Sequence, residues 1–110
     1  MTKIRIERRR GIIRNSFTLC MEGHADFDPG NDIVCAALSA FFFALANYLD
    51  DIGAAPSVKY ESGRAFIKCK GGRKARFALE FVIFALYMLE ARYPGNVKVY
   101  ETPRDTVCRK

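Results

Sequence analysis

Residues 32–50 run DIVCAALSAFFFALANYLD, and this stretch decides the fold. Asp32 suits a helix N-cap, because a short carboxylate there accepts a hydrogen bond from the free N–H groups of the first turn. The segment predicts a helix to about Asp50 that is apolar almost all round, so it must be buried on more than one side. In a domain this small, the second side indicates a subunit interface, and we expect a homodimer. The apolar positions are Ile33, Val34, Ala37, Leu38, Phe41, Phe42, Leu45 and Leu49.

The segments around this helix alternate between strand and helix patterns. Strands are predicted at 3–7, from Phe17 to a close at Gly23-His24, at 58–60, at 65–69 and at 97–99, and a second helix at 74–92. The second helix carries a stripe of apolar residues at Phe77, Phe81, Phe84, Ala85, Met88 and Leu89. The order β-β-α-β-β-α-β predicts one small α+β domain over residues 1–102, with an antiparallel or mixed sheet and two helices. A frayed tail is expected over 103–110.

Composition narrows the class of protein. With 110 residues, half of them apolar and 27% charged, the chain is an ordinary single globular domain and not a disordered or collagen-like one. The run from Ile33 to Ala46 has about 14 residues where a bilayer span needs about 20, so no membrane partner is expected. The N-terminus carries no signal-peptide core. We therefore expect a cytoplasmic protein whose four cysteines are reduced thiols.

Charge is unevenly placed along the chain. Residues 1–14 carry +5, residues 15–62 carry −6, residues 63–76 carry +6 and residues 77–110 carry +1. Two basic segments around an acidic one indicate a surface able to meet RNA or a partner bound to nucleic acid. A solvated strand edge and a solvated helix start account for the pattern equally well.

His24 and Cys35 are the candidate reactive residues. His24 ends a strand, and Cys35 lies in the first turn of the helix, where the macrodipole favours a thiolate and free N–H groups could receive an oxyanion. Thiolate, imidazole and amide donors together serve acyl transfer from a peptide. A packed core thiol and a structural histidine are the plain alternative. Packing residues surround Cys20 and Cys69 in the predicted strands, and Cys108 lies in the expected tail. A zinc site on Cys20, His24 and Cys35 would lack a fourth ligand, so no metal is expected.

The strings Gly23-His24-Ala25 and Gly30-Asn31-Asp32-Ile33-Val34-Cys35-Ala36-Ala37-Leu38-Ser39-Ala40 closely resemble the signature of the ribosomal-processing cysteine proteases called Prp. Tyr93-Pro94 and Val97-Lys98-Val99 resemble the family's closing segment. The resemblance implies a homodimeric cysteine endopeptidase without a cofactor, with Cys35 and His24 as a dyad. It also implies a substrate, the N-terminal extension of large-subunit ribosomal protein number twenty-seven. Asp32 and Ser39 match recurrent family positions. Physically, Asp32 is the helix cap and Ser39 shares a helix face with Cys35.

The segment between the two candidate residues is expected to be a flexible substrate loop that orders when the peptide binds. It contains Ala25, Asp26, Phe27, Asp28, Pro29, Gly30 and Asn31. It is one residue shorter than the family form, and its two aspartates favour a basic peptide. Two further classes stay open: a non-enzymatic ribosome- or RNA-associated binding module, and an inactive protease-like scaffold.

Overall fold

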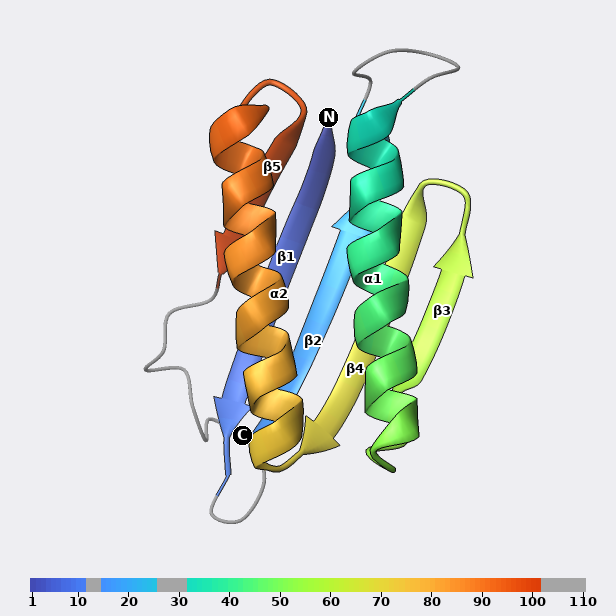
Figure 1. The fold of residues 1–110 in the computed structure, drawn as a ribbon, viewed down its shortest axis with the longest axis vertical. Coiled ribbons are helices and arrows are strands. Elements are labelled where there is room, and N and C mark those ends of the chain that lie inside the picture. Colours follow the sequence, from blue (N-terminus) through green and yellow to red (C-terminus); the bar gives the residue numbers. More distant parts are fainter. Residues whose placement is uncertain (12–14, 26–31, 102–110) are drawn as a thin grey trace.

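The computed structural model describes residues 1–11, 15–25 and 32–101 (Figure 1). The predicted order β-β-α-β-β-α-β is confirmed, and most strands extend a residue or more beyond the predicted ranges. The elements are β1 (Thr2–Arg10), β2 (Asn15–Glu22), α1 (Ile33–Asp51), β3 (Ser57–Glu61), β4 (Arg64–Gly71), α2 (Arg73–Arg92) and β5 (Val97–Glu101). The tail expected at 103–110 lies outside the described residues, as do residues 26–31 of the expected loop.

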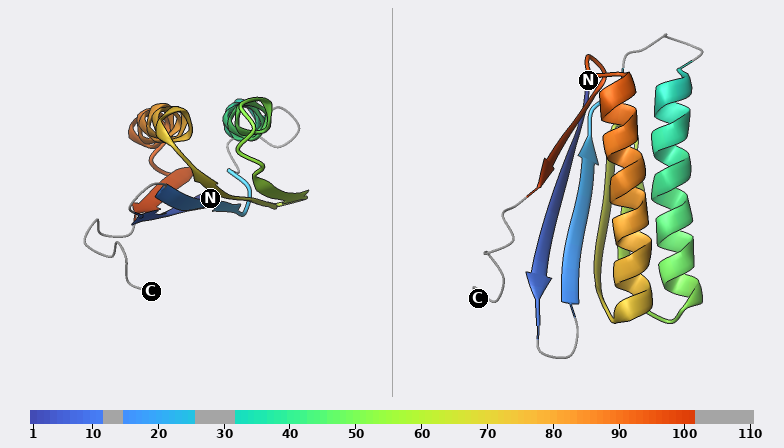
Figure 2. Two further views of the ribbon diagram at one scale, coloured as in Figure 1. Left: turned by 90° about the horizontal axis from the view of Figure 1, so that it is seen from below. Right: turned by 60° about the vertical axis from the view of Figure 1, so that its left-hand side comes forward.

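The five strands form one mixed sheet in the order β3-β4-β2-β1-β5. All neighbouring pairs are antiparallel except β1 and β5, which run parallel and join the two ends of the described chain. Both helices lie side by side on the same face of this sheet (Figure 2). The protein is therefore a two-layer α/β arrangement in which no described helix covers the second face of the sheet.

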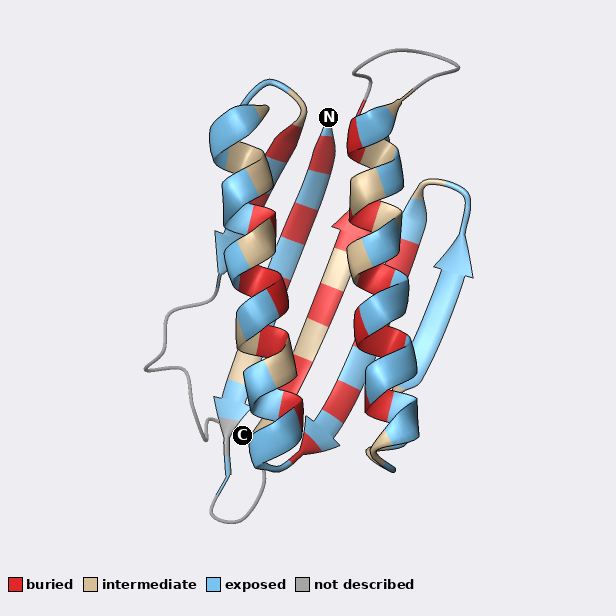
Figure 3. Cartoon of the chain, viewed as in Figure 1, coloured by how far each residue is buried: buried red, intermediate tan, exposed pale blue. Residues whose placement is uncertain are grey.

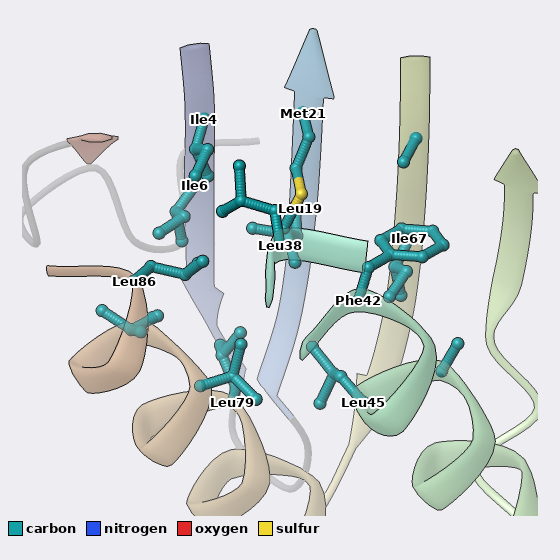
Figure 4. Packing of buried hydrophobic residues seen from close by; sticks show 14 of the residues in the cluster. Ile4, Ile6, Leu19, Met21, Leu38, Phe42, Leu45, Ile67, Leu79 and Leu86 are labelled. Atoms are coloured by element: carbon teal, nitrogen blue, oxygen red, sulfur yellow. The ribbon is translucent and has the colours of Figure 1, made fainter. Parts of the chain in front are cut away.

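The core lies between the sheet and the two helices. Along β1, β2 and β4, more buried residues alternate with less buried ones, because successive side chains point to opposite faces, whereas the edge strand β3 is exposed along its whole length (Figure 3). Ile4, Leu19 and Ile67 are fully buried on the helix-facing side and meet Phe42 and Leu86 from the two helices (Figure 4). Buried residues recur about every 2 positions in these strands and about every 3.6 positions in the helices, so each of these elements turns one face toward the core.

Helix α1 is buried in the core on one side, as expected. Its buried residues are Val34, Leu38, Phe42, Leu45, Ala46 and Leu49. The opposite side exposes small residues at four-residue spacing, Ala36, Ala40 and Ala44. Burial of this second side in a subunit interface stays a prediction, because the structure contains one copy of the chain.

Helix α2 turns its apolar stripe away from the sheet. Its buried face consists of Ala75, Leu79, Val82, Ile83 and Leu86. Of the stripe identified in the sequence, Phe77, Phe81, Phe84 and Met88 are between 59% and 74% exposed. The stripe is genuine, but it forms the outer surface of the helix layer, and the core face is built from smaller aliphatic residues that lie between its members.

By length and composition alone, the 19-residue helix α1 would be long and apolar enough to cross a membrane, with a mean hydropathy of 1.7. One side of α1 supplies six buried side chains to the core. The helix of a globular core passes the same test of length and composition, and the packing of α1 on the sheet places it in that group.

Candidate active site

A pocket opens at the end of the sheet where β2 ends, α1 begins and the β3–β4 turn comes closest. Its volume is about 160 Å³. The lining residues come from β1, β2, α1, β3 and the β3–β4 turn, and include both His24 and Cys35. Two residues that are eleven positions apart in the sequence are thus brought to one hollow, as acyl transfer would require.

The backbone at Gly23 places His24 at the pocket. Gly23 has a φ of +92°, and a Cβ there would lie 2.6 Å from the carbonyl oxygen of Met1. Only glycine fits this close approach without strain. The Gly23 N–H donates to the carbonyl oxygen of Gly63 at 2.8 Å, which continues the β2–β4 pairing by one residue. His24 therefore leaves the sheet at a fixed point beside the β3–β4 turn.

Cys35 is held in the first turn of α1 by the helix cap. The Asp32 side chain accepts a hydrogen bond from the Cys35 N–H at 2.9 Å, and the Asp32 carbonyl oxygen accepts one from the Ala36 N–H at 3.1 Å. Asp32 is therefore the N-cap. Its bond occupies the backbone amide of Cys35 itself, so that amide is not free to receive an oxyanion while the cap is closed.

A backbone N–H from the segment after β2 donates to the thiol. The Ala25 N–H donates to Cys35 Sγ at 3.3 Å. Ala25 is fully buried, and its carbonyl oxygen accepts a hydrogen bond from Asn96 Nδ2 at 2.8 Å. Ala25 therefore differs from the flexible loop residue expected from the sequence, because both of its backbone polar groups are tied down.

The imidazole of His24 lies against the β3–β4 turn. A Cβ added to Gly63, whose φ is +76°, would lie 3.1 Å from His24 Nε2. Within the described residues, no hydrogen bond joins the His24 ring to Cys35 Sγ. Ser39, one helical turn after Cys35, lines the same pocket together with Leu38 and Tyr60. The pocket thus holds a thiol, an imidazole and a hydroxyl, and the buried Ala25 N–H donates to the thiol from outside the pocket lining.

The remaining cysteines lie away from this pocket. Cys20 alternates with buried residues of β2 and lies on the sheet face opposite the helices, whereas Cys35 lies on the helix side. Partial burial and the neighbouring Glu22 carboxylate raise the pKa of the Cys20 thiol. Cys69 is buried, with Sγ 3.8 Å from the Ala54 carbonyl oxygen, and Cys108 lies outside the described residues. Cys20, His24 and Cys35 do not converge, and no group of three potential metal ligands gathers in the described part of the chain.

Two residues of the site were not anticipated from the sequence. Gly63 looks like an ordinary hairpin glycine, and Asn96 like a turn residue after Pro94-Gly95. Their importance arises from contacts over 39 residues for Gly63 with His24 and over 71 residues for Asn96 with Ala25. No pattern in the neighbouring sequence predicts such a contact, whereas Asp32, a typical N-cap residue, predicts the helix start that contains Cys35.

The fold and this pocket define a small α/β protein with a cysteine and a histidine placed for thiol chemistry at the edge of one sheet. The family model described as cysteine protease Prp matches residues 1–98. The chain therefore belongs to the Prp family of ribosomal-processing cysteine proteases, and it is an enzyme of that class.

Solved structures agree with this assignment. The chain is similar to the essential ribosomal processing protease Prp from S. aureus with a covalently linked product peptide, at 25% identity and a TM-score of 0.81, covering 93% of this chain and 100% of that one. The same protease with a substrate peptide gives a TM-score of 0.72 at 23% identity, again with 93% and 100% covered. The protein SMU.848 from Streptococcus mutans gives 0.65 at 23% identity, with 93% and 96% covered. A comparison with curated protein sequences gives no match.

Proposed function

We propose that this chain removes a short N-terminal extension from large-subunit ribosomal protein number twenty-seven, in the bacterial cytoplasm, with Cys35 as nucleophile and His24 as base and acid. The observation that carries the proposal is the shared pocket: Cys35 Sγ accepts the Ala25 N–H at 3.3 Å, and His24 lines the same hollow. Because Ala25 directly follows His24, one short backbone segment carries both the amide that donates to the thiol and the imidazole proposed as its base. The S. aureus relative carries a covalently linked product peptide, which supports a covalent route.

The reaction begins when His24 takes the proton of Cys35 and the thiolate attacks the scissile carbonyl carbon. An S–C bond forms, and the electron pair of the C=O bond moves onto the oxygen. The Ala25 N–H is the donor closest to Sγ and is therefore the candidate to stabilise this oxyanion. The oxyanion collapses, the C–N bond breaks, and His24 delivers its proton to the leaving amine.

Water then attacks the resulting thioester. His24 accepts a proton from that water, the C–S bond breaks, and the product leaves with a free carboxyl group. Cys35 leaves as thiolate beside the protonated His24, which restores the starting pair. No step requires a metal ion or a cofactor.

His24 must rotate toward Cys35 for the first step, because its ring rests against Gly63 in this structure. We infer that a bound peptide, lying between α1 and the β3–β4 turn, brings the two side chains together. A site that closes only on its substrate cleaves other peptides slowly.

The proposal includes a homodimer formed through the helix layer. Phe77, Phe81, Phe84 and Met88 follow one another at spacings of four, three and four residues on the outer side of α2, and all are more than half exposed. The alanines on the outer side of α1 allow a second helix to approach closely. Exposed apolar stripes of this kind are unusual on monomers and typical of interfaces. The proposed interface therefore contains α1, as predicted from the sequence, and also α2.

The test of the active site is alkylation of Cys35 by iodoacetamide across pH, with Cys20, Cys69 and Cys108 replaced by Ser. We expect alkylation to persist well below pH 8.5, the range of an ordinary thiol, and to lose this low-pH reactivity in His24→Ala. The raised pKa of Cys20 makes that thiol the matched slow control in the protein that retains it.

Cleavage is measured next, on a peptide that spans the extension junction of the ribosomal protein. Cys35→Ala is expected to keep its far-ultraviolet circular dichroism and to lose cleavage completely. Cleavage retained by Cys35→Ala excludes the proposed nucleophile. A reactive Cys35 without cleavage of this peptide leaves the thiol chemistry in place and rejects the substrate, and an unreactive Cys35 in a folded protein identifies an inactive scaffold.

A further inference from the structure

The described helices leave one face of the sheet open (Figure 2). This face carries a net charge close to that of the whole protein. Side chains that alternate with the buried ones point to this side. Its basic members are Lys3, Arg5, Arg9, Lys59, Arg64, Lys68, Lys70 and Lys98, and its acidic members are Glu7, Glu22 and Glu61. Eight basic and three acidic residues give this face a charge of +5, compared with +6 for the whole chain.

The strand register arranges these charges in rows across the sheet. One row contains Tyr100, Arg5, Cys20, Phe66 and Lys59, one residue from each strand. The two aromatic residues of this row are three strand spacings apart, about 14 Å. Tyr100 is 44% exposed, and Phe66 is half-buried. Arg5 lies between the aromatic residues, so the row combines planar rings with a cationic side chain.

Most of the positive charge on this face is not neutralised within the protein. Glu22 lies 3.8 Å from both Arg5 and Arg64 and compensates part of their charge. Lys98 lies 3.9 Å from Glu90 of α2. Lys3, Arg9, Lys59, Lys68 and Lys70 form no ion pair with another described residue. Lysines that have no carboxylate partner remain available for anions from solution, and they repel one another while the anion is absent.

We propose that this open face, defined as the outward side of β1, β2, β3, β4 and β5, binds single-stranded RNA. Phosphates contact the lysine rows along β3 and β4, and bases stack on Phe66 and Tyr100. Proteins that bind single-stranded nucleic acid combine basic side chains with aromatic rings. The basic side chains contact the phosphate of each nucleotide, and the rings stack on the bases. A lipid surface would instead favour several large apolar side chains, and the outward positions of the described strands contain two, Phe66 and Tyr100, among eight basic residues.

The peptide pocket lies on the helix side of the sheet and shares Glu61 and Arg64, at the β3–β4 turn, with the open face. Lys59, Lys68 and Lys70 do not line the pocket, so variants of these three lysines test the two sites independently. RNA binding is measured without peptide, and peptide cleavage is measured without RNA. Either activity can fail while the other persists. With both sites, the enzyme would bind the RNA of an assembly while it cleaves a protein of the same assembly.

The experiment is fluorescence anisotropy with a labelled mixed-sequence RNA of 12 nucleotides, titrated between 50 and 200 mM KCl. We expect a dissociation constant in the range of about 1–100 µM near physiological salt. The affinity should fall as salt rises. Replacing Lys59, Lys68 and Lys70 by Ala should weaken binding at least tenfold and flatten the slope of log K against log salt by about 2, since each phosphate contact contributes about 0.7 on single strands.

The matched control removes three positive charges from the helix layer. Arg73, Lys74 and Arg76 are exposed at the start of α2, and their replacement by Ala should change the RNA affinity less than threefold. Phe66→Leu keeps an apolar side chain but removes the ring, and it should weaken binding by about fivefold or more.

Three outcomes overturn the proposal. The first is no binding by 100 µM wild-type protein at 50 mM KCl. The second is an equal loss in the sheet and helix variants, which would show that only net charge matters. The third is tighter binding to vesicles of phosphatidylglycerol than to RNA, with the same dependence on Lys59, Lys68 and Lys70, which would identify a membrane as the partner.

Discussion

The Asn96 side chain donates a hydrogen bond to the backbone carbonyl oxygen of Ala25 at 2.8 Å, across 71 residues of sequence. Asn96 is itself anchored, because its carbonyl oxygen accepts the Thr2 N–H at 2.9 Å and its N–H donates to the Tyr93 carbonyl oxygen at 2.9 Å. The Ala25 peptide in turn points its N–H at Cys35 Sγ. The connection between α2 and β5 therefore fixes the backbone that faces the Cys35 thiol.

Asn96→Leu should slow alkylation of Cys35 by iodoacetamide at pH 7 by about three- to tenfold, because it removes the neutral hydrogen bond that anchors Ala25 beside the thiol, and such a bond is worth about 1 kcal/mol. The variant keeps a side chain of similar size but has no donor for the Ala25 carbonyl oxygen. Asn96→Gln keeps an amide donor and should recover part of the rate. The full pH profile distinguishes a change at the thiol from a change in stability.

Asn47→Leu is the matched control for this position. Asn47 is exposed on α1, and the same substitution there should leave the alkylation rate unchanged. Asn96→Leu with an unaltered pH profile would show that Asn96 supports only the fold around Ala25.

Gly63→Ala should reduce peptide cleavage at least tenfold. The new methyl group would lie 3.1 Å from His24 Nε2 and would displace the imidazole. Gly53 provides the control, because its φ of +78° is almost the same as the +76° of Gly63, while a Cβ there meets nothing within 4 Å. Both variants should lose about 1–2 kcal/mol of unfolding free energy from the left-handed backbone. Only Gly63→Ala should lose activity. Equal activity in the two variants, measured well below their melting temperatures, argues against a role of the turn in placing His24.

Phe81→Glu should convert the protein to a monomer in sedimentation velocity at micromolar concentration. Phe81 is 74% exposed, the most exposed of the large apolar side chains, and it lies in the middle of the α2 stripe. A charge there would be desolvated in a dimer without a partner. Tyr100→Glu introduces the same charge on the opposite layer and should leave the dimer intact. A wild-type protein that sediments as a monomer at this concentration rules out the proposed interface.

Stability should fall between pH 10 and 12 through Tyr87. Partial burial and the hydrogen bond from the Tyr87 hydroxyl to Glu101 at 2.6 Å raise the pKa of Tyr87 to about 12. Since the pKa is higher in the folded protein than in the unfolded chain, the stabilising contribution is complete below pH 10 and is lost as the pH rises toward 12. Melting temperatures at pH 9, 10 and 11 test this. Tyr87→Phe should be less sensitive to pH over that range, and Tyr48→Phe, on the exposed side of α1, should behave as wild type.

The order of elements could be predicted from the sequence because its signals are local. Alternation around Ile4 and Leu19 marks strands, and Asp32 before an apolar run marks a helix start. These signals depend on neighbours within one or two turns, so they survive without knowledge of the fold. Asp32 and Cys35 belong to this group, since cap and thiol are three residues apart.

Other features depend on what the fold brings together. In α2, both the stripe containing Phe81 and the face containing Leu79 repeat at helical spacing, and periodicity alone does not tell which one meets a sheet. The larger aromatic residues face outward here, against the usual preference for burial. The contacts of Gly63 and Asn96 with the site join segments that are distant in sequence and leave no local trace.

The parallel pairing of β1 with β5 links the fold to the order in which the chain is made. β5 is the last described strand, and it docks beside the first, with Thr2 opposite Val97. A nascent chain that has not yet produced Asn96 has no anchor for the Ala25 peptide. Sequence-distant pairings of this kind form late and slowly in folding. The Ala25 peptide should therefore be anchored beside Cys35 only after β5 has left the ribosome and paired with β1, so the proposed reactivity of Cys35 would follow that pairing.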